Sequence, residues 1–463
     1  MILKFSIKNY RSFREEQTLE MVASNRYDDH LDHLAAIPDD ENKALPIAVM
    51  YGPNGAGKSN FVKALALLES LVWRGTEPKK PIERRPFLLD ETCAKEPTEL
   101  AIQFLEGGRA YAYGCRVNDE VVVAEWLSLL RQGKELEVFE RITHDSGTVE
   151  IEVGDVLQED TWGDHSKVRA LAKVGAVLPN QLFLHTIHKS VKEDEQGPVI
   201  ADALRWFGER LTIIGPEAAF ADLARLVAAD ESFTEFAGEF LREVSTGVDR
   251  LKVETAELDE NVVGSVLAPL KSLIDKLPAG ERTVFPGPDG SQLIIEKGTG
   301  TKLRLRTIQA EHVIAGGKRV VFPFGEESDG TQRVTHLLPA LHAIRRRPRV
   351  FVIDEIDRSL HPMLAKAFVS FFLKACQGRQ SQMILTTHDI GLMDLDLLRR
   401  DEVCFADKKQ DGSTELYSLS EYRVRNDLKV DKGYLQGRFG AVPFVRTVES
   451  LLDRPEPDAG QKP

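Results

Sequence analysis

Residues 52–59 read Gly52-Pro53-Asn54-Gly55-Ala56-Gly57-Lys58-Ser59, and they stand between the apolar run Leu45–Met50 and a helical pattern that begins at Asn60. Strand, glycine-rich turn and helix is the order in which the pattern G-x-x-x-x-G-K-[ST] forms a phosphate-binding loop. The glycines let successive backbone N–H groups turn toward one anion, and the helix N-terminus adds its dipole. We therefore predict that this loop binds a nucleoside triphosphate.

Two side chains of the loop have chemistry of their own. Lys58 can bring its charge to the β- and γ-phosphates, and the Ser59 hydroxyl can bind a Mg²⁺ ion. The alternative is a structural turn followed by an incidental Lys-Ser pair, and the flanking strand and helix argue against it. We predict ATP and Mg²⁺ as ligands. The residues predicted to bind the nucleotide here are Gly52, Asn54, Gly55, Gly57, Lys58, Ser59 and Asn60.

The composition is that of a globular protein with more than one lobe. A chain of 463 residues exceeds the size at which single cores stop growing. No apolar run approaches the roughly eighteen residues that would suggest a membrane span, and the first residues alternate like a strand, so we expect a cytoplasmic protein without a membrane partner. The net charge of −13 argues against a global basic field for nucleic acid, and any such contact would be a local patch. Four cysteines without a C-x-x-C pair argue against a structural zinc site and against a disulfide scaffold.

A second apolar run ends in two carboxylates. Residues 349–353 read Arg-Val-Phe-Val-Ile, typical of a buried parallel strand, and Asp354 and Glu355 follow directly. Asp354 is predicted to hold Mg²⁺ together with Ser59, and Glu355 to polarise an attacking water as general base. Acidic residues also end apolar strands for solvation alone, but a phosphate-binding loop requires a partner of this kind.

Two further segments are predicted to complete the site. The run from Ser328 to Gln332 opens a helix, which alone would indicate only an N-cap. Between the two motifs above it is similar to the signature loop of ABC-type ATPases, although Asp329 stands where glycine is usual. Ser328 and Gly330 would then meet the γ-phosphate held by a second subunit. The strand from Gln382 ends in His388, a candidate for the switch histidine, although a lone histidine at a strand end is more often structural.

The rest of the chain shows a change of periodicity. Strand patterns around a hairpin turn at 106–109 predict an antiparallel sheet between the phosphate-binding loop and the middle of the chain. Residues from about 155 to 280 carry helical spacing, including 166–176, 201–211, 218–229 and 233–244, and strands are predicted near 293–296 and 303–306. Residues 26–44 are expected to form a polar surface loop.

Together these motifs resemble the ABC-type ATPases of the RecF and SMC group. Within that group the chain looks most like bacterial AAA-family ATPases of the RloA and AbiL type, which are related to overcoming-lysogenization-defect ATPases. The resemblance covers residues 1–125 and about 310–440. It depends on the segments Asn9–Phe13, Gly52–Ser59, Glu327–Arg333, Ile353–Pro362, Leu385–Asp389 and Lys432–Pro443.

The resemblance implies an α/β fold: an ABC-type P-loop ATPase head, with a mixed sheet, helices and an antiparallel β subdomain, and an inserted, mainly helical lobe. The expected divisions are residues 1–150 and 311–450 for the two halves of the head, 151–310 for the lobe, and 451–463 for a disordered tail. It also implies a head-to-head homodimer, or a higher homo-oligomer, with ATP between one subunit's phosphate-binding loop and the other's signature loop. Gln103 is a candidate for the Q-loop glutamine.

The resemblance leaves the role of such a switch open. One hypothesis is a sensor ATPase of an anti-phage defence system that controls a partner effector nuclease encoded nearby. The alternative is a RecF-like DNA-repair ATPase that acts directly on DNA, with residues 345–349 as the densest basic patch, although cations also suit the end of a helix. A nuclease activity of the chain itself is disfavoured. The acidic residues Asp394, Asp396, Asp401 and Glu402 are expected to form a solvated face.

Overall fold

The computed structural model describes residues 1–217, 220, 223–258, 282–286, 292–297, 303–422 and 430–442. The predicted tail, residues 451–463, lies outside this range, as does most of 259–302. In the described part of the chain, no helix is both long and apolar enough to cross a membrane.

A six-stranded sheet carries the phosphate-binding loop. Its first five strands are parallel, and the last is antiparallel at the edge. The strands β5, β17 and β18 are buried along their whole length, which explains their continuous apolar sequences, since helices or another sheet cover both faces. In spatial order the strands are β11 (Leu211–Ile214), β17 (Val350–Ile353), β18 (Gln382–Thr386), β5 (Ile47–Tyr51), β19 (Val403–Lys408) and β20 (Thr414–Ser418).

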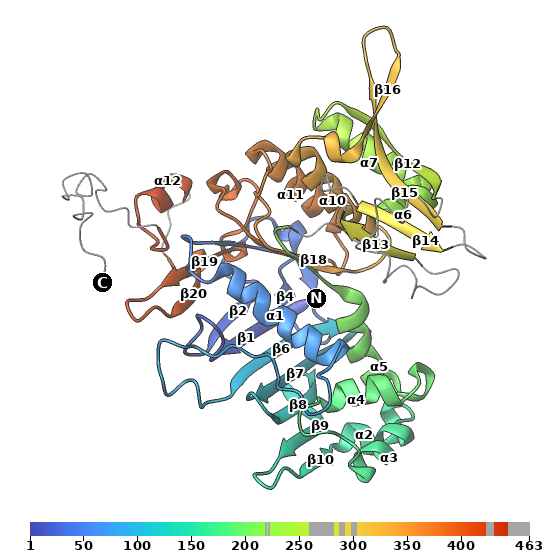
Figure 1. The fold of residues 1–463 in the computed structure, drawn as a ribbon. Helices are drawn as coiled ribbons and strands as arrows, with labels where there is room; N and C mark the ends of the chain where they lie inside the picture. The colour runs from blue at the N-terminus through green and yellow to red at the C-terminus, as the bar shows by residue number, and fades with distance from the viewer. Residues whose placement is uncertain are drawn as a thin grey trace, which may run out of the picture.

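Alternate residues of β5 enter two different cores. Ala48 and Met50 pack with helix α1 (Lys58–Trp73), whereas Val49 and Tyr51 pack with helices α10 (Asp329–Ile344) and α11 (Pro362–Cys376). This is the period of two that a strand buried on both faces requires. The central sheet therefore lies between α1 on one face and α10 and α11 on the other (Figure 1).

An antiparallel sheet of seven strands packs on the far side of α1. Phe5 from this sheet meets Phe61 of α1 edge to face, with ring centroids 5.4 Å apart. The antiparallel subdomain predicted from the sequence is therefore present. In spatial order its strands are β10 (Val149–Val153), β9 (Lys134–Thr143), β8 (Val122–Arg131), β7 (Arg109–Val117), β6 (Thr98–Glu106), β1 (Ile2–Lys8) and β2 (Gln17–Glu20). A separate two-stranded pair joins β3 (Ala35–Ala36) and β4 (Lys43–Ala44).

The middle of the chain holds helices and strands. The helical patterns at 166–176, 201–211, 218–229 and 233–244 correspond to helices, although 218, 219, 221 and 222 are outside the described residues. Among the described residues of this part, the helices are α2 (Asp155–Gln158), α3 (Ser166–Val174), α4 (Phe183–Ser190), α5 (Pro198–Arg205), the π-helix η4 (Trp206–Arg210), α6 (Leu223–Ala229) and α7 (Glu231–Glu243).

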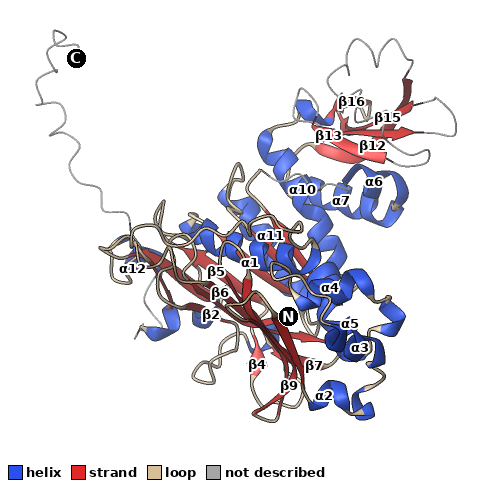
Figure 2. Ribbon diagram, turned by 60° about the horizontal axis from the view of Figure 1, so that its bottom comes forward, coloured by secondary structure: helices blue, strands red, loops and turns tan. Residues whose placement is uncertain are grey.

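Two findings add to the mainly helical middle, with strands near 293–296 and 303–306, that the sequence predicts. Leu211, expected to end a helix, begins β11, which pairs in parallel with β17 at the edge of the central sheet. A second sheet follows α7 and stands at the opposite end of the molecule from the seven-stranded sheet (Figures 1 and 2). Its strands are β12 (Val248–Leu258), β13 (Arg282–Pro286), β14 (Gln292–Lys297), β15 (Leu303–Val313) and β16 (Arg319–Pro323).

Short helices complete the described chain. Helix α12 (Val430–Leu435) lies near the end of the described residues and packs Tyr434 on Tyr51 and Phe405. The 3₁₀ turns are η1 (Leu31–His33), η2 (Asp160–Trp162), η3 (Glu193–Glu195), η6 (Phe324–Glu326), η7 (Ile390–Leu392), η8 (Arg400–Glu402) and η9 (Leu419–Glu421).

Candidate nucleotide-binding site

The turn between β5 and α1 requires glycine at two positions for different reasons. A Cβ on Gly52 would stand 2.1 Å from the carbonyl oxygen of Ala406, so the backbones approach too closely for any side chain. Gly57 has φ of 113°, and a Cβ there would lie 2.2 Å from Thr414 Oγ1. Gly55 also has a positive φ, 78°, but open space around it. The turn is therefore a concave backbone cradle of the kind that surrounds a phosphate.

Lys58 is buried beside this cradle, and its hydrogen-bond partners among the described residues are all neutral. Its ammonium donates to the carbonyl oxygens of Gly52 (2.8 Å) and Pro53 (3.3 Å) and lies 3.1 Å from His388 Nε2. Burial lowers the pKa of Lys58 to about 8, against the opposing effect of Asp357, Asp354 and Glu355. A buried ammonium beside neutral groups is suited to an incoming anion.

His388 stands beside Lys58 at the end of β18. Partial burial of the ring, and then the Lys58 charge, lower the pKa of His388, which favours the neutral imidazole. Asp357 holds its backbone, because the His388 N–H donates to Asp357 Oδ2 at 3.2 Å and the Thr387 hydroxyl donates to Asp357 Oδ1 at 2.8 Å. The structure thus brings the predicted switch histidine to the predicted lysine.

Ser59, in the first turn of α1, meets Asp354, which directly follows β17. The Ser59 hydroxyl donates to Asp354 Oδ1 at 3.2 Å, and the Thr386 hydroxyl donates to the same oxygen at 2.6 Å. Asp354 is 3% exposed. A carboxylate and a hydroxyl are oxygen donors of the type Mg²⁺ prefers, so this pair fits the ion that the sequence predicts.

Glu355 follows directly and has an unusual backbone. Its φ is 51°, in the left-handed region, and its N–H donates to the Thr386 hydroxyl at 2.8 Å. Residues held in this region cluster at functional sites, because the surroundings must offset the strain. The same Thr386 hydroxyl therefore orients Asp354 through its proton and Glu355 through its lone pair.

Ser328 and Gly330 lie at the start of α10, next to the segment that follows Glu355. Ser328 caps the helix, since the Thr331 N–H donates to its Oγ at 3.2 Å. A Cβ on Gly330 would be 2.8 Å from the Ser359 carbonyl oxygen, so glycine permits this close packing. One turn later Arg333 approaches the Asp354 carbonyl oxygen at 3.5 Å. It remains a prediction that Ser328 faces the nucleotide of a second subunit.

The sequence reasoning missed two residues that brace the turn. The Thr414 hydroxyl lies 2.7 Å from both Ser12 Oγ and the Ala56 carbonyl oxygen, and Asn60 Nδ2 donates to Ser12 Oγ at 2.9 Å. Ser12 lies inside the quoted segment Asn9–Phe13, which offered a signal. No sequence signal marked Thr414, because its position beside the turn depends on the pairing of β20 with β19.

Three predicted positions lie elsewhere or have other partners. Gln103 is in β6, paired with Lys4 and Ala112 in the seven-stranded sheet, and its role as a Q-loop residue stays a prediction. In the basic segment 345–349, Arg346 pairs with Asp230 at 2.8 Å and Arg347 with Glu209 at 3.4 Å. These internal pairs lessen the charge available for DNA.

The expectation of a solvated acidic face after His388 is wrong in part. Asp401 is 6% exposed and Glu402 is fully buried. Both are buried because each has a partner: Asp401 accepts from Arg399, and Glu402 accepts from His33 and from the Arg399 backbone.

Comparison with known proteins identifies the family. The chain belongs to the family described as "AAA domain, putative AbiEii toxin, Type IV TA system", whose model matches residues 47–394. That range runs from β5 to beyond His388 and includes the phosphate-binding loop and Asp354, so the protein is by family a P-loop protein with an AAA domain. The match does not single out the RloA and AbiL type, which stays a prediction. No curated protein matches this chain.

Solved structures of SMC heads are also similar to this chain. The SMC head domain from Thermotoga maritima is 14% identical, with a TM-score of 0.37, and the match covers 91% of this chain and 99% of that one. An Smc head bound to the C-terminal domain of ScpA, derived from Pyrococcus furiosus, is 13% identical with a TM-score of 0.34, covering 94% and 98%.

Proposed function

We propose that this protein is an ATP-binding and ATP-hydrolysing switch that dimerises head to head around the nucleotide. The observation that carries the proposal is the direct contact of Ser59 with Asp354, 3.2 Å apart, beside the glycine cradle and Lys58. Motifs 295 residues apart in sequence thus meet as one site. Each has the chemistry that phosphate or its metal ion requires.

The proposed roles follow from the positions of the side chains. Lys58 and the backbone N–H groups of the loop bind the β- and γ-phosphates, and Ser59 and Asp354 would hold the Mg²⁺ ion. When bound, Mg²⁺ neutralises charge on the phosphate oxygens. Glu355 orients and deprotonates the attacking water, and His388 steadies the γ-phosphate from beside Lys58. Ser328 and Gly330 of a second copy close the site.

A Glu355→Gln variant tests the hydrolytic role. The amide keeps the shape of the side chain but cannot accept the proton of water, so we expect ATP binding near the wild-type level and turnover lower by about 10²-fold or more. Size-exclusion chromatography with ATP is expected to show the variant accumulating as a dimer. Lys58→Ala is the matched control, because it should lose ATP binding as well. Wild-type turnover in Glu355→Gln would remove Glu355 from this role.

We also propose that the switch serves a defence system with a partner effector. The description of its family, a putative toxin of a toxin–antitoxin system, supports this placement. Affinity purification of the tagged protein, expressed with its neighbouring genes, followed by mass spectrometry, tests it. An ATP-dependent nuclease partner is the expected result. Salt-sensitive DNA binding by the purified chain, without any partner protein, would point to direct action on DNA instead.

A further inference from the structure

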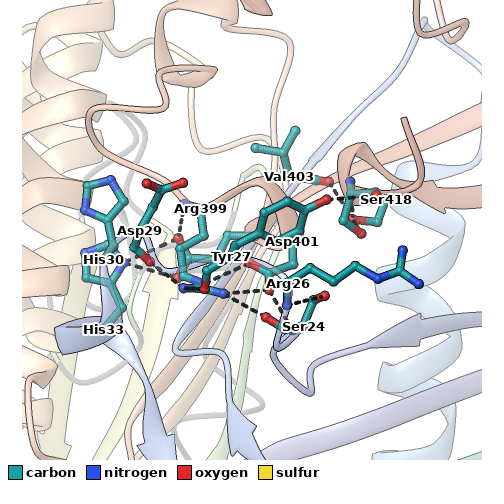
Figure 3. A network of polar contacts seen from close by, with 12 residues as sticks. Ser24, Arg26, Tyr27, Asp29, His30, His33, Arg399, Asp401, Val403 and Ser418 are labelled. Carbon is teal, nitrogen blue, oxygen red and sulfur yellow. Dashed lines mark hydrogen bonds and ion pairs between the residues drawn. The ribbon is translucent and has the colours of Figure 1, made fainter. Parts of the chain in front are cut away.

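A buried arginine, Arg399, links the segment that follows β2 to the turn η8, which directly precedes β19. The Arg399 side chain is fully buried and donates from Nε and Nη2 to the two oxygens of Asp401, each at 2.9 Å. It also donates to the carbonyl oxygens of Ser24, Tyr27 and Asp29 (Figure 3). Residues 24–29 are therefore fixed, although residues 26–44 were expected to form a polar surface loop.

Three side chains that could bind a metal ion follow directly on this fixed segment. His30, Asp32 and His33 each offer a ligand atom, and these atoms all lie within 4.8 Å of one another. The two rings lie side by side at one end of the network, with centroids 4.8 Å apart (Figure 3). His33 is buried, His30 half-buried and Asp32 exposed, so the cluster opens to solvent on one side.

The other ring nitrogen of each histidine is already used. His30 Nε2 lies 2.9 Å from the Leu395 carbonyl oxygen, which can only accept, so Nε2 carries the proton and Nδ1 keeps its lone pair. His33 Nδ1 lies 3.2 Å from the Glu402 carboxylate, and donation there leaves the lone pair of Nε2 free. This is the outer-shell arrangement that orients histidines in metal sites. Gln377 likewise donates to Asp32 Oδ2.

We propose that His30, Asp32 and His33 bind one divalent transition-metal ion of the zinc class. Two imidazole nitrogens and one carboxylate favour zinc over magnesium or calcium, and the open side leaves room for water as the fourth ligand. Bond lengths near 2.0–2.1 Å require ligand atoms roughly 3.3 Å apart, so the exposed Asp32 and the His30 ring must move inward. The ion would tie the segment after β2 to Leu395 and Glu402, independently of the nucleotide site.

Zinc titration of the full chain tests this site. After treatment with a chelator and dialysis, Zn²⁺ alone is added in a buffer that contains millimolar Mg²⁺, and binding is followed by calorimetry and by the melting temperature. Co²⁺ serves as a spectroscopic probe of four-coordination. The wild-type chain is expected to bind one equivalent of zinc and to melt at a higher temperature with it. Lys58→Ala should bind equally, which separates this site from the nucleotide site.

Two variants and a control make the result decisive. Asp32→Asn changes an exposed side chain, and His30→Asn suits the left-handed backbone of residue 30, with φ of 48°. Each should weaken zinc binding on the order of 10- to 100-fold or more, while melting without metal stays near wild type. His144→Asn, at a half-exposed histidine paired with Glu150, should bind as wild type. Equal binding in all variants, or no binding to the wild-type chain, would overturn the proposal.

Discussion

Lys58 illustrates how a single buried charge sets the conditions for binding. Its ammonium is surrounded by carbonyl oxygens and a neutral ring, and its pKa is lowered to about 8. A phosphate beside it would favour the charged form and raise that pKa again. Below about pH 8 the lysine is already protonated before ATP binds. Above it, binding must take up a proton.

This linkage predicts the pH dependence of affinity. The dissociation constant for ATP should be flat from pH 7 to 8 and then rise by up to about tenfold per pH unit, because each unit removes the proton that the complex needs. Equilibrium titration with a fluorescent ATP analogue between pH 7 and 10 measures it. Lys58→Arg is the control, since a guanidinium stays protonated throughout and its affinity should not follow this slope. A flat wild-type profile would show that the Lys58 charge does not contribute to binding.

At the scale of elements, the turn before α1 depends on contacts that come from far along the chain. Ser12 follows β1 and Thr414 begins β20, yet both reach the backbone or side chains of the turn. Both side chains lie close to Gly57: a Cβ added to this glycine would be 2.2 Å from Thr414 Oγ1 and 2.8 Å from Ser12 Oγ. Gly55 lacks such neighbours, although both glycines have positive φ.

The comparison of these two glycines gives a test of the packing. Gly55→Ala should cost about 1 kcal/mol of unfolding free energy, from the left-handed backbone alone. Gly57→Ala should cost roughly 1–3 kcal/mol more, because Thr414 and Ser12 must also move. Denaturant unfolding without nucleotide measures both. Equal losses in the two variants would mean that β20 yields freely and does not brace the turn.

The elements that the sequence revealed are those with local signals. The loop at 52–59, the strand before Asp354 and the helix after Ser328 each have a motif and a period within about twenty residues. Strand β11 has neither, because a four-residue strand with three apolar residues, directly after a helical pattern, cannot be told from the last turn of that helix. Its partner β17 is also remote in sequence. Thr414 also lacks a local signal in the sequence. So does the cluster of His30, Asp32 and His33, because the orientation of its two histidines depends on the remote residues Leu395 and Glu402.

At the scale of the whole molecule, the proposed dimer makes each ATP site composite. Lys58, Asp354 and Glu355 would come from one copy, and Ser328 from the other. Within one chain the close packing of Gly330 against Ser359 fixes the start of α10 beside the segment after Glu355. A mixture of two inactive variants should then regain ATPase activity only when one variant is changed in the half that holds Lys58, and the other in the half that holds Ser328.

Mixing experiments distinguish such a dimer from a chain that works alone. Ser328→Asp should keep the helix cap, since aspartate caps as well as serine, but place a negative charge toward the γ-phosphate. Alone, it and Lys58→Ala should each hydrolyse little ATP. Mixed in equal amounts and allowed to exchange, half of the dimers would be mixed and each would hold one intact site, so activity should return to about a quarter of the wild-type rate.

The control for this experiment pairs lesions that fall in the same half of the site. A mixture of Lys58→Ala with Glu355→Gln should stay inactive, because the half of each site that holds Lys58, Asp354 and Glu355 then carries a defect in every copy. Steady-state ATPase assays, with subunit exchange verified by two different tags, measure both mixtures. If Ser328→Asp and Lys58→Ala together give no more than the sum of their separate rates, Ser328 does not act on a second copy's ATP. Recovery in the first mixture alone requires a site shared between two chains, because no arrangement within one chain can supply it.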